Sequence, residues 1–130
     1  MYLYDTNIFL EILLGQAASE KAMGALELMS ENRRGWISSF SLHAIEAIVG
    51  SKGRFDVLSD FLSFVSEHPY LDRYSTSTED EAKICGVAPG LKLDFDDSLQ
   101  YSVAKSKHLT LVTFDKDFLR VKGIKVLFPS

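Results

Sequence analysis

The sequence contains little cysteine, little proline and no long uninterrupted apolar run. Its 130 residues include 1 cysteine, Cys85, so no disulfide and no zinc or iron–sulfur site of several thiolates can form within one chain. With 3 prolines and 8 glycines it is not a fibrous or low-complexity chain. The apolar stretch at residues 8–14 is interrupted by Glu11 and is shorter than the roughly 20 residues of a membrane span. We therefore expect a cytoplasmic protein that does not associate with membranes.

The composition is that of a folded domain. Hydrophobic residues make up 46% of the chain, charged residues 25% and aromatic residues 12%. A chain of this length suits one domain, residues 1–130, and buries roughly two-thirds of its unfolded surface. The net charge is −4, from 14 Lys and Arg against 18 Asp and Glu. Taken alone, this sum weakly disfavours a nucleic-acid binder, because such domains tend to be basic.

Short apolar segments alternate with segments of helical periodicity. The apolar segments predict strands at Tyr2–Tyr4, Trp36–Ser38, Leu71–Tyr74, Leu109–Phe114 and, at an edge of the sheet, Ile124–Phe128. The periodic segments predict helices at Asn7–Leu14, Ser19–Arg33, Ser41–Val49 with Ser41 as cap, Arg54–Glu67, Thr78–Val87, and from Asp96 or Asp97 to Lys107. Pro89-Gly90 predicts a turn. The alternation predicts an α/β fold, a three-layer α/β/α sandwich with a mainly parallel central sheet.

Four acids stand at related places among these elements. Asp5 and Asp115 each follow a predicted strand directly, Asp97 lies in the first turn of a helix, and Glu46 lies in the helix after the second strand. Because the carboxyl ends of parallel strands share one edge of the sheet, these four carboxylates could converge on one cleft. Each acid alone also fits an ordinary role, and helix capping by itself is the favoured interpretation of Asp97.

Converging carboxylates repel one another unless a cation lies among them. Hard oxygen ligands favour Mg²⁺ or Mn²⁺, and ions held in this way serve phosphodiester chemistry. Setting the four acids aside leaves 14 acidic against 14 basic residues, so the remaining surface is balanced. Lys52, Arg54 and Lys116 are then candidate phosphate contacts, although each also fits a solvated charged face.

Four segments of the chain carry a family resemblance: Tyr2–Leu10 (YLYDTNIFL), Asp94–Gln100 (DFDDSLQ), Leu111–Phe118 (LVTFDKDF) and Gly123–Pro129 (GIKVLFP). In this order they resemble the first strand with its D-T-N/S motif, the D-[AS]-[LI] helix start, the T-x-D-x-D-F motif and the closing strand of PIN-domain ribonucleases. The likeness is greatest to the small VapC-like toxins of prokaryotic toxin–antitoxin pairs, and it extends from end to end.

The resemblance implies a set of roles. It places the metal-binding and catalytic acids at Asp5, Glu46, Asp97 and Asp115, with Asp117, Asn7 and Thr113 as auxiliary residues. Asp94, Asp96 and Asp97 are alternatives for the metal-binding acid of the helix-start motif; only Asp97 directly precedes the small residue, Ser98, that is followed by Leu99. The family acts on RNA as Mg²⁺-dependent endoribonucleases, usually as homodimers, and an antitoxin protein holds the toxins inactive.

Two other functions compete with this one. Phosphoaspartyl enzymes also gather acids around Mg²⁺, but a receiver-like nucleophile and lysine are not apparent, and Asn7 stands where a dehalogenase-type phosphatase has its second acid. A PIN-like module that binds RNA or protein without catalysis is the main alternative. Among the other residues, Cys85 is expected in the core, and His43 could share a helix face with Glu46.

Overall fold

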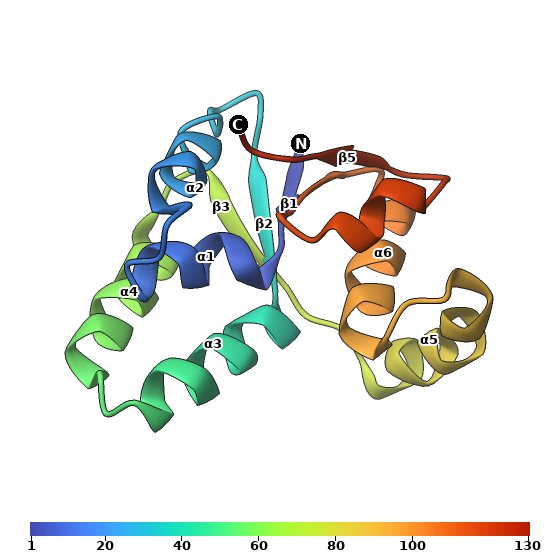
Figure 1. The fold of residues 1–130 in the computed structure, drawn as a ribbon, viewed down its shortest axis with the longest axis horizontal. Helices are drawn as coiled ribbons and strands as arrows, with labels where there is room; N and C mark the ends of the chain where they lie inside the picture. The colour runs from blue at the N-terminus through green and yellow to red at the C-terminus, as the bar shows by residue number, and fades with distance from the viewer.

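The five predicted strands form a single sheet in the computed structural model, which describes residues 1–130. All four pairings are parallel, and the strand order is β3-β2-β1-β4-β5 (Figure 1). The strands are β1 (Tyr2–Tyr4), β2 (Gly35–Ser38), β3 (Leu71–Tyr74), β4 (Thr110–Val112) and β5 (Lys125–Leu127). The last strand lies at an edge of the sheet, as the sequence predicts.

Helices connect each strand to the next. Two helices lie in each of the first three connections: α1 (Thr6–Leu13) and α2 (Ser19–Leu26), α3 (Ser39–Ser51) and α4 (Phe55–Glu67), α5 (Thr78–Leu91) and α6 (Phe95–Lys107). A 3₁₀ helix, η1 (Lys116–Arg120), lies between β4 and β5. None of the helices has both the length and the apolar character needed to cross a membrane.

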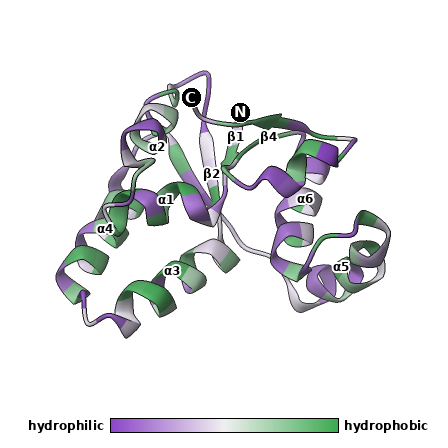
Figure 2. Ribbon diagram, viewed as in Figure 1, coloured by the Kyte–Doolittle hydropathy of each residue, from purple (hydrophilic) through white to green (hydrophobic).

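The helices cover the two faces of the sheet and make three layers. Neighbouring strand residues point to opposite faces, so Leu3 and Leu111 pack with α5, α6 and η1, while Tyr4 and Val112 pack with α1, α2, α3 and α4. Figure 1 shows the first four helices on one side of the strands and the last two on the other. Along α1, α3 and α4, hydrophobic and hydrophilic residues alternate, as in helices that bury one face (Figure 2). The predicted three-layer α/β/α fold is confirmed.

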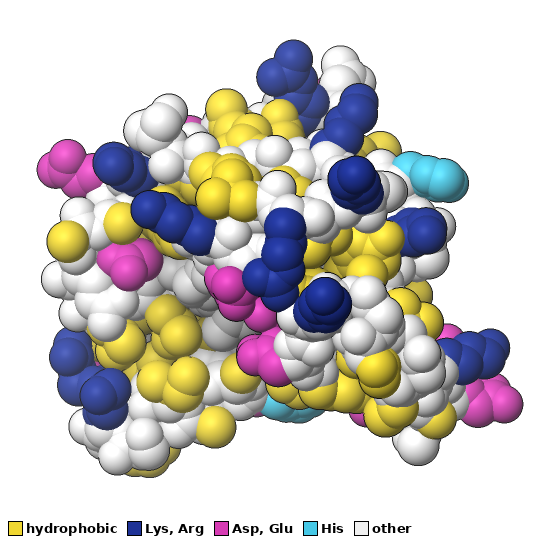
Figure 3. Space-filling model, turned by 45° about the vertical axis from the view of Figure 1, so that its right-hand side comes forward, with side chains coloured by type: hydrophobic (Ala, Val, Ile, Leu, Met, Phe, Trp, Pro, Cys, Tyr) yellow, Lys and Arg dark blue, Asp and Glu magenta, His cyan; other side chains and the backbone are white.

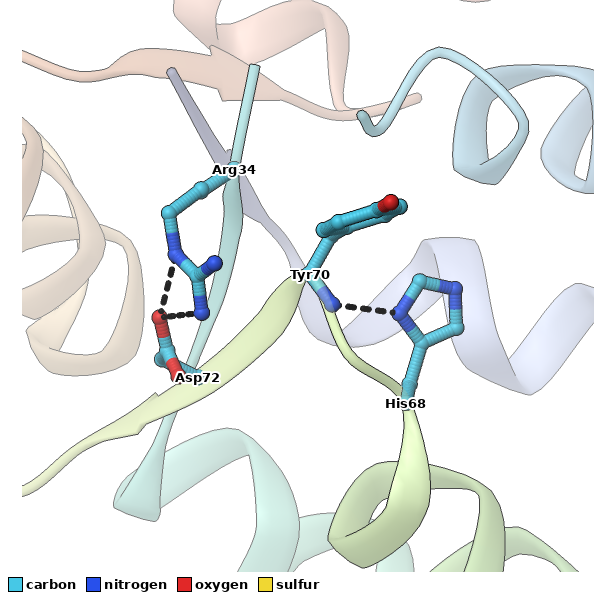
Figure 4. Close-up of polar contacts among 4 residues, drawn as sticks. All are labelled: Arg34, His68, Tyr70 and Asp72. Carbon is cyan, nitrogen blue, oxygen red and sulfur yellow. Dashed lines mark hydrogen bonds and ion pairs between the residues drawn. The ribbon is translucent and has the colours of Figure 1, made fainter. Parts of the chain in front are cut away.

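Near the amino ends of β2 and β3, one polar contact joins the two strands and another shapes the segment before β3 (Figure 4). Arg34 donates from Nε and Nη2 to Oδ2 of Asp72, at 3.0 and 2.8 Å. The backbone N–H of Tyr70 donates to Nδ1 of His68 at 3.1 Å. These contacts lie near the edge of the sheet opposite to the carboxyl ends of the strands, so they hold the scaffold without occupying the other edge.

The structure corrects several sequence expectations about helix bounds, turns and burial. The second helix ends at Leu26 rather than Arg33, because the chain turns so that Met29 is buried and Ser30 pairs with Arg33 in an isolated bridge. The expected turn at Pro89-Gly90 lies inside α5, where a proline near the helix end removes only one hydrogen bond. That helix stops instead at Lys92, which adopts a left-handed φ of 56°. Cys85 is exposed, not in the core.

Candidate functional site

The candidate site lies at the carboxyl edge of the sheet, where β1 and β4 are neighbours. From β1 the chain adds β2 and then β3 on one side of the sheet. It then returns to place β4 and β5 on the other side of β1, so the strand order reverses between β1 and β4. In open parallel sheets such a reversal leaves a crevice outside the strand ends. The Asp5 N–H donates to the Val112 carbonyl at 2.9 Å, which places Asp5 at this crevice.

Asp5 is buried there, with 5% of its surface exposed. It caps α1, because its Oδ1 accepts from the N–H of Thr6 at 2.8 Å. Its Oδ2 accepts from Oγ1 of Thr113 at 2.7 Å and from Nδ2 of Asn7 at 3.3 Å. Nε2 of Gln100 lies 3.3 Å from Oδ1. Four donors on four different residues therefore fix the orientation of one buried carboxylate.

Asp97 enters the site because a neighbouring acid performs the capping role. Asp94, not Asp96 or Asp97, is the N-cap of α6, and its Oδ1 accepts from the Asp97 N–H at 3.2 Å. The expectation that Asp97 caps the helix is thus wrong. The same holds for Ser41 in α3, where Ser38 is the cap. The Asp97 side chain is 8% exposed and points into the site rather than to the helix end.

Asp115 and Asp117 approach Asp97 from the segment after β4. Asp115 caps η1 by accepting from the Asp117 N–H at 2.9 Å, and its own N–H donates to Thr113 Oγ1 at 2.9 Å. Carboxylate oxygens of Asp97, Asp115 and Asp117 lie within 4.8 Å of one another. Thr113 therefore contacts both Asp5 and Asp115, and it joins the two strand-end acids through one hydroxyl group.

Burial and mutual repulsion perturb these acids. Burial first, and then the charges of Asp115, Asp94, Asp96 and Asp5, raise the pKa of Asp97 to about 8. Burial also raises the pKa of Asp5; the hydrogen bonds from Thr113 and Thr6 oppose this shift, and the Asp115 charge adds to it. The interactions show that Asp5, Asp97 and Asp115 share one electrostatic site, in which the ionised forms are unfavourable without a compensating positive charge.

Glu46 stands apart from this group. Its Oε1 lies 3.0 Å from Nδ1 of His43, one turn earlier on α3, so the two residues do share a helix face. Glu46 does not belong to the group of clustered carboxylates, and its side-chain hydrogen bond is to His43. The helix that carries it nevertheless begins at the same sheet edge, directly after β2.

Basic side chains border the acids on one side. Figure 3 shows Lys and Arg side chains beside acidic ones at the centre of one face of the molecule. Lys116 is exposed and stands between Asp115 and Asp117. Arg120 was not predicted: its Nη1 lies 3.8 Å from Asp117 Oδ1, and its Nη2 donates to the Lys92 carbonyl at 2.6 Å. A basic residue three positions after an acid, on one turn of a helix, was the available sequence indication.

The other two predicted basic contacts lie elsewhere. Lys52 and Arg54 are in the connection between α3 and α4, at the end of α3 that is distant from the sheet (Figure 1). They are exposed and form no ion pair. The structure thus separates them from Lys116, which the sequence grouped with them.

The donor set fits a hard divalent cation. Asp97, Asp115 and Asp117 offer only carboxylate oxygens, Asp5 lies beside them, and no cysteine or histidine joins the group. Mg²⁺ and Mn²⁺ prefer such ligands, whereas zinc favours nitrogen and sulfur. Asp94 and Asp96 form a second, more exposed group with Asp97, but Asp94 is already engaged as the helix cap.

Comparison with known proteins gives one family and several similar folds. A family model for the PIN domain matches residues 2–124. No curated protein matches the chain. A toxin–antitoxin complex from Klebsiella pneumoniae contains a similar chain with a TM-score of 0.78 and 21% identity, covering 100% of this chain and 98% of that one.

Two further solved structures are similar. VapBC2 from Rickettsia felis, bound to a DNA fragment from its promoter, has a TM-score of 0.77 and 21% identity over 99% of this chain and 98% of that one. VapC20 from Mycobacterium tuberculosis, a toxin that cleaves the sarcin–ricin loop, has a TM-score of 0.79 and 12% identity over 97% of this chain and 98% of that one. At these identities the likeness establishes the fold, which is VapC-like.

The raised pKa of Asp97 predicts how the metal-free protein responds to pH. The folded-state pKa of about 8 exceeds the ordinary 3.8, so the contribution of Asp97 to stability is fully present below about pH 4 and is lost as pH rises to about 8. Asp97→Asn removes this titration. In EDTA, we expect the variant to have a higher melting temperature than the wild type at about pH 9, with the difference shrinking towards about pH 4. A pH-independent difference in thermal unfolding would contradict the repulsion described here.

Proposed function

This chain belongs to the PIN domain family, and we propose that it is a metal-dependent endoribonuclease, the toxin of a toxin–antitoxin pair. The observation that carries the proposal is the buried Asp5, held by four donors and electrostatically coupled to Asp97 and Asp115. A protein that only binds a partner has no need for buried carboxylates that destabilise one another.

In this proposal Asp5, Asp97, Asp115 and Glu46 hold Mg²⁺ or Mn²⁺. When bound, the ion supplies Lewis acidity at the RNA phosphate and lowers the pKa of a water molecule. Asn7 and Thr113 orient Asp5, and Thr113 also fixes the backbone before Asp115. Asp117 adds a carboxylate at the rim of the group, and Glu46 acts from α3, positioned by its hydrogen bond with His43.

The RNA backbone approaches this site along its basic border. Lys116 adjoins two of the acids, and Arg120 lies close to Asp117, with its guanidinium held by the Lys92 carbonyl. A planar guanidinium suits phosphate oxygens. Lys52 and Arg54 lie at the end of α3 that is distant from the acids, so in this proposal they contact only an RNA long enough to reach beyond the site.

An apolar groove supports an antitoxin partner. Between α1, α2 and α4 lies a groove of about 360 Å³, lined by eight hydrophobic residues and Asp60. Met23 and Phe64 on its wall are 50% and 37% exposed. One similar chain comes from a toxin–antitoxin complex, and an apolar helix face of a small antitoxin fits such a groove. The proposal also includes a homodimer, which the protein's mass in solution tests.

Asp5→Asn tests the catalytic proposal. Asparagine caps helices as well as aspartate does, so the fold should be kept. We expect the rate of RNA cleavage to fall by more than about 100-fold, which exceeds the usual effect of changing a residue that only supports the metal ligands. The affinity for Mn²⁺, measured by calorimetry, should fall as well. Asp56→Asn, an exposed acid in the first turn of α4, is the control. Wild-type protein that neither binds Mn²⁺ nor cleaves RNA would favour the non-catalytic binding module.

Lys116→Ala and Arg120→Ala test the path of the RNA. In the Asp5→Asn background, where RNA binds without being cleaved, we expect each change to weaken binding. In a plot of the logarithm of the RNA-binding constant against the logarithm of the salt concentration, the slope should become less steep by about 0.7 for each phosphate that the variant no longer neutralises. Lys21→Ala, on the exposed side of α2, should leave the slope unchanged. Equal slopes for all three variants would place the RNA elsewhere. Lys52→Ala should weaken binding of long RNA only.

Met23→Glu tests the partner groove. We expect a small reading frame beside the gene for this chain, whose product inhibits cleavage by binding the groove. A buried unpaired carboxylate should weaken that binding at least about 10-fold by calorimetry. Val87→Glu, 43% exposed on α5 across the sheet, is the matched control. Equal inhibition of wild type and Met23→Glu would exclude the groove as the interface.

A further inference from the structure

Gln100 carries a buried side-chain amide that has no role in the proposed mechanism as described above. It lies in α6 between Leu99 and Tyr101 and is 1% exposed. Its Nε2 donates to Ser41 Oγ at 2.6 Å and to Asp5 Oδ1 at 3.3 Å, while its Oε1 is buried without a hydrogen-bond partner. An orphan buried acceptor opposes folding, so stability alone does not explain a glutamine at this position.

The amide lies where three segments of the site meet. Gln100 is three residues after Asp97, so the two side chains lie on the same side of α6. From there it contacts the end of β1, through Asp5, and the first turn of α3, through Ser41. Ser41 Oγ also accepts from Thr6 Oγ1 at 2.8 Å. The contacts therefore link the helices that carry Asp97 and Glu46 to the acid at the centre of the site.

Gln100 differs from the other three residues that donate to Asp5. Thr6 and Asn7 lie next to Asp5 in the sequence, and Thr113 comes from the strand that pairs with β1. Only Gln100 donates from α6, the helix that bears Asp97. Its hydrogen bond to Oδ1 is thus the one side-chain hydrogen bond that ties the Asp5 carboxylate directly to α6.

We propose that Gln100 is a positioning residue that orients the Asp5 carboxylate towards Asp97 and so sets the affinity of the site for its divalent ion. This inference rests on the proposed function. Gln100 itself contacts neither the ion nor the RNA. Its loss should weaken ion binding, while binding of RNA and the maximal rate at saturating ion are retained.

Gln100→Met tests the role, because methionine has a similar length and flexibility but cannot donate. By calorimetry we expect the Kd for Mn²⁺ to rise about 10- to 100-fold, as for other residues that orient metal ligands. The Mn²⁺ concentration for half-maximal cleavage should rise in parallel, kcat should recover at saturating Mn²⁺, and KM for RNA should not change. Tyr101→Phe is the control: Tyr101 is the next residue on α6, and the change removes a hydrogen bond to the carbonyl of Lys122, away from the acids.

A merely structural glutamine would give a different result: a lower melting temperature with an unchanged Kd for Mn²⁺, which would overturn the inference and leave the proposed function intact. If the wild type itself binds no Mn²⁺, both the inference about Gln100 and the proposed function fail. Should Gln100→Met not fold, Ser41→Ala carries the test, since it removes the other oxygen that holds the amide. We expect a smaller rise in Kd for Mn²⁺ from Ser41→Ala, and no rise would overturn the inference.

Discussion

The carboxylate of Asp5 is the constraint around which the site is built. It is buried at the only reversal of strand order in the sheet, where water cannot compensate its charge. Hydrogen bonds from Thr6, Thr113, Asn7 and Gln100 hold it in one orientation. Those from Thr113, Thr6 and Gln100 lower the pKa of Asp5, but burial, the largest effect, and the Asp115 charge raise it. The folded chain therefore holds a carboxylate in one orientation at a place where its ionised form needs a cation beside it.

The parallel sheet explains why residues far apart in the sequence meet there. Asp5 follows β1 and Thr113 follows β4, and these strands pair in register from Tyr2 with Thr110 to Tyr4 with Val112. The next residues on both strands thus leave the sheet side by side. Contacts such as Arg34 with Asp72 secure the sheet near its other edge, so the acidic edge is free for chemistry.

The sequence predicted the elements whose limits depend on local pattern. The strands Tyr2–Tyr4 and Leu71–Tyr74 have the expected bounds, and the positions of Asp5 and Asp115 after strands were enough to place both acids at one edge. Pro89 could not be placed correctly, because a proline inside the last turn of a helix and one in a turn look alike in sequence.

The supporting residues were harder to predict, since their roles arise from tertiary contacts. Gln100 lies between Leu99 and Tyr101 in the sequence, and only the contacts of α6 with β1 and α3 show why its polar side chain is buried. Similarly, the choice among Asp94, Asp96 and Asp97 depends on which of them caps the helix, and Asp94 does so.

The most direct measurement is a crystal structure of the protein soaked in Mn²⁺, with diffraction recorded at the manganese absorption edge. The account predicts an anomalous peak enclosed by Asp5, Asp97 and Asp115. No peak at saturating Mn²⁺, or a peak confined to the exposed pair Asp94 and Asp96, would contradict it.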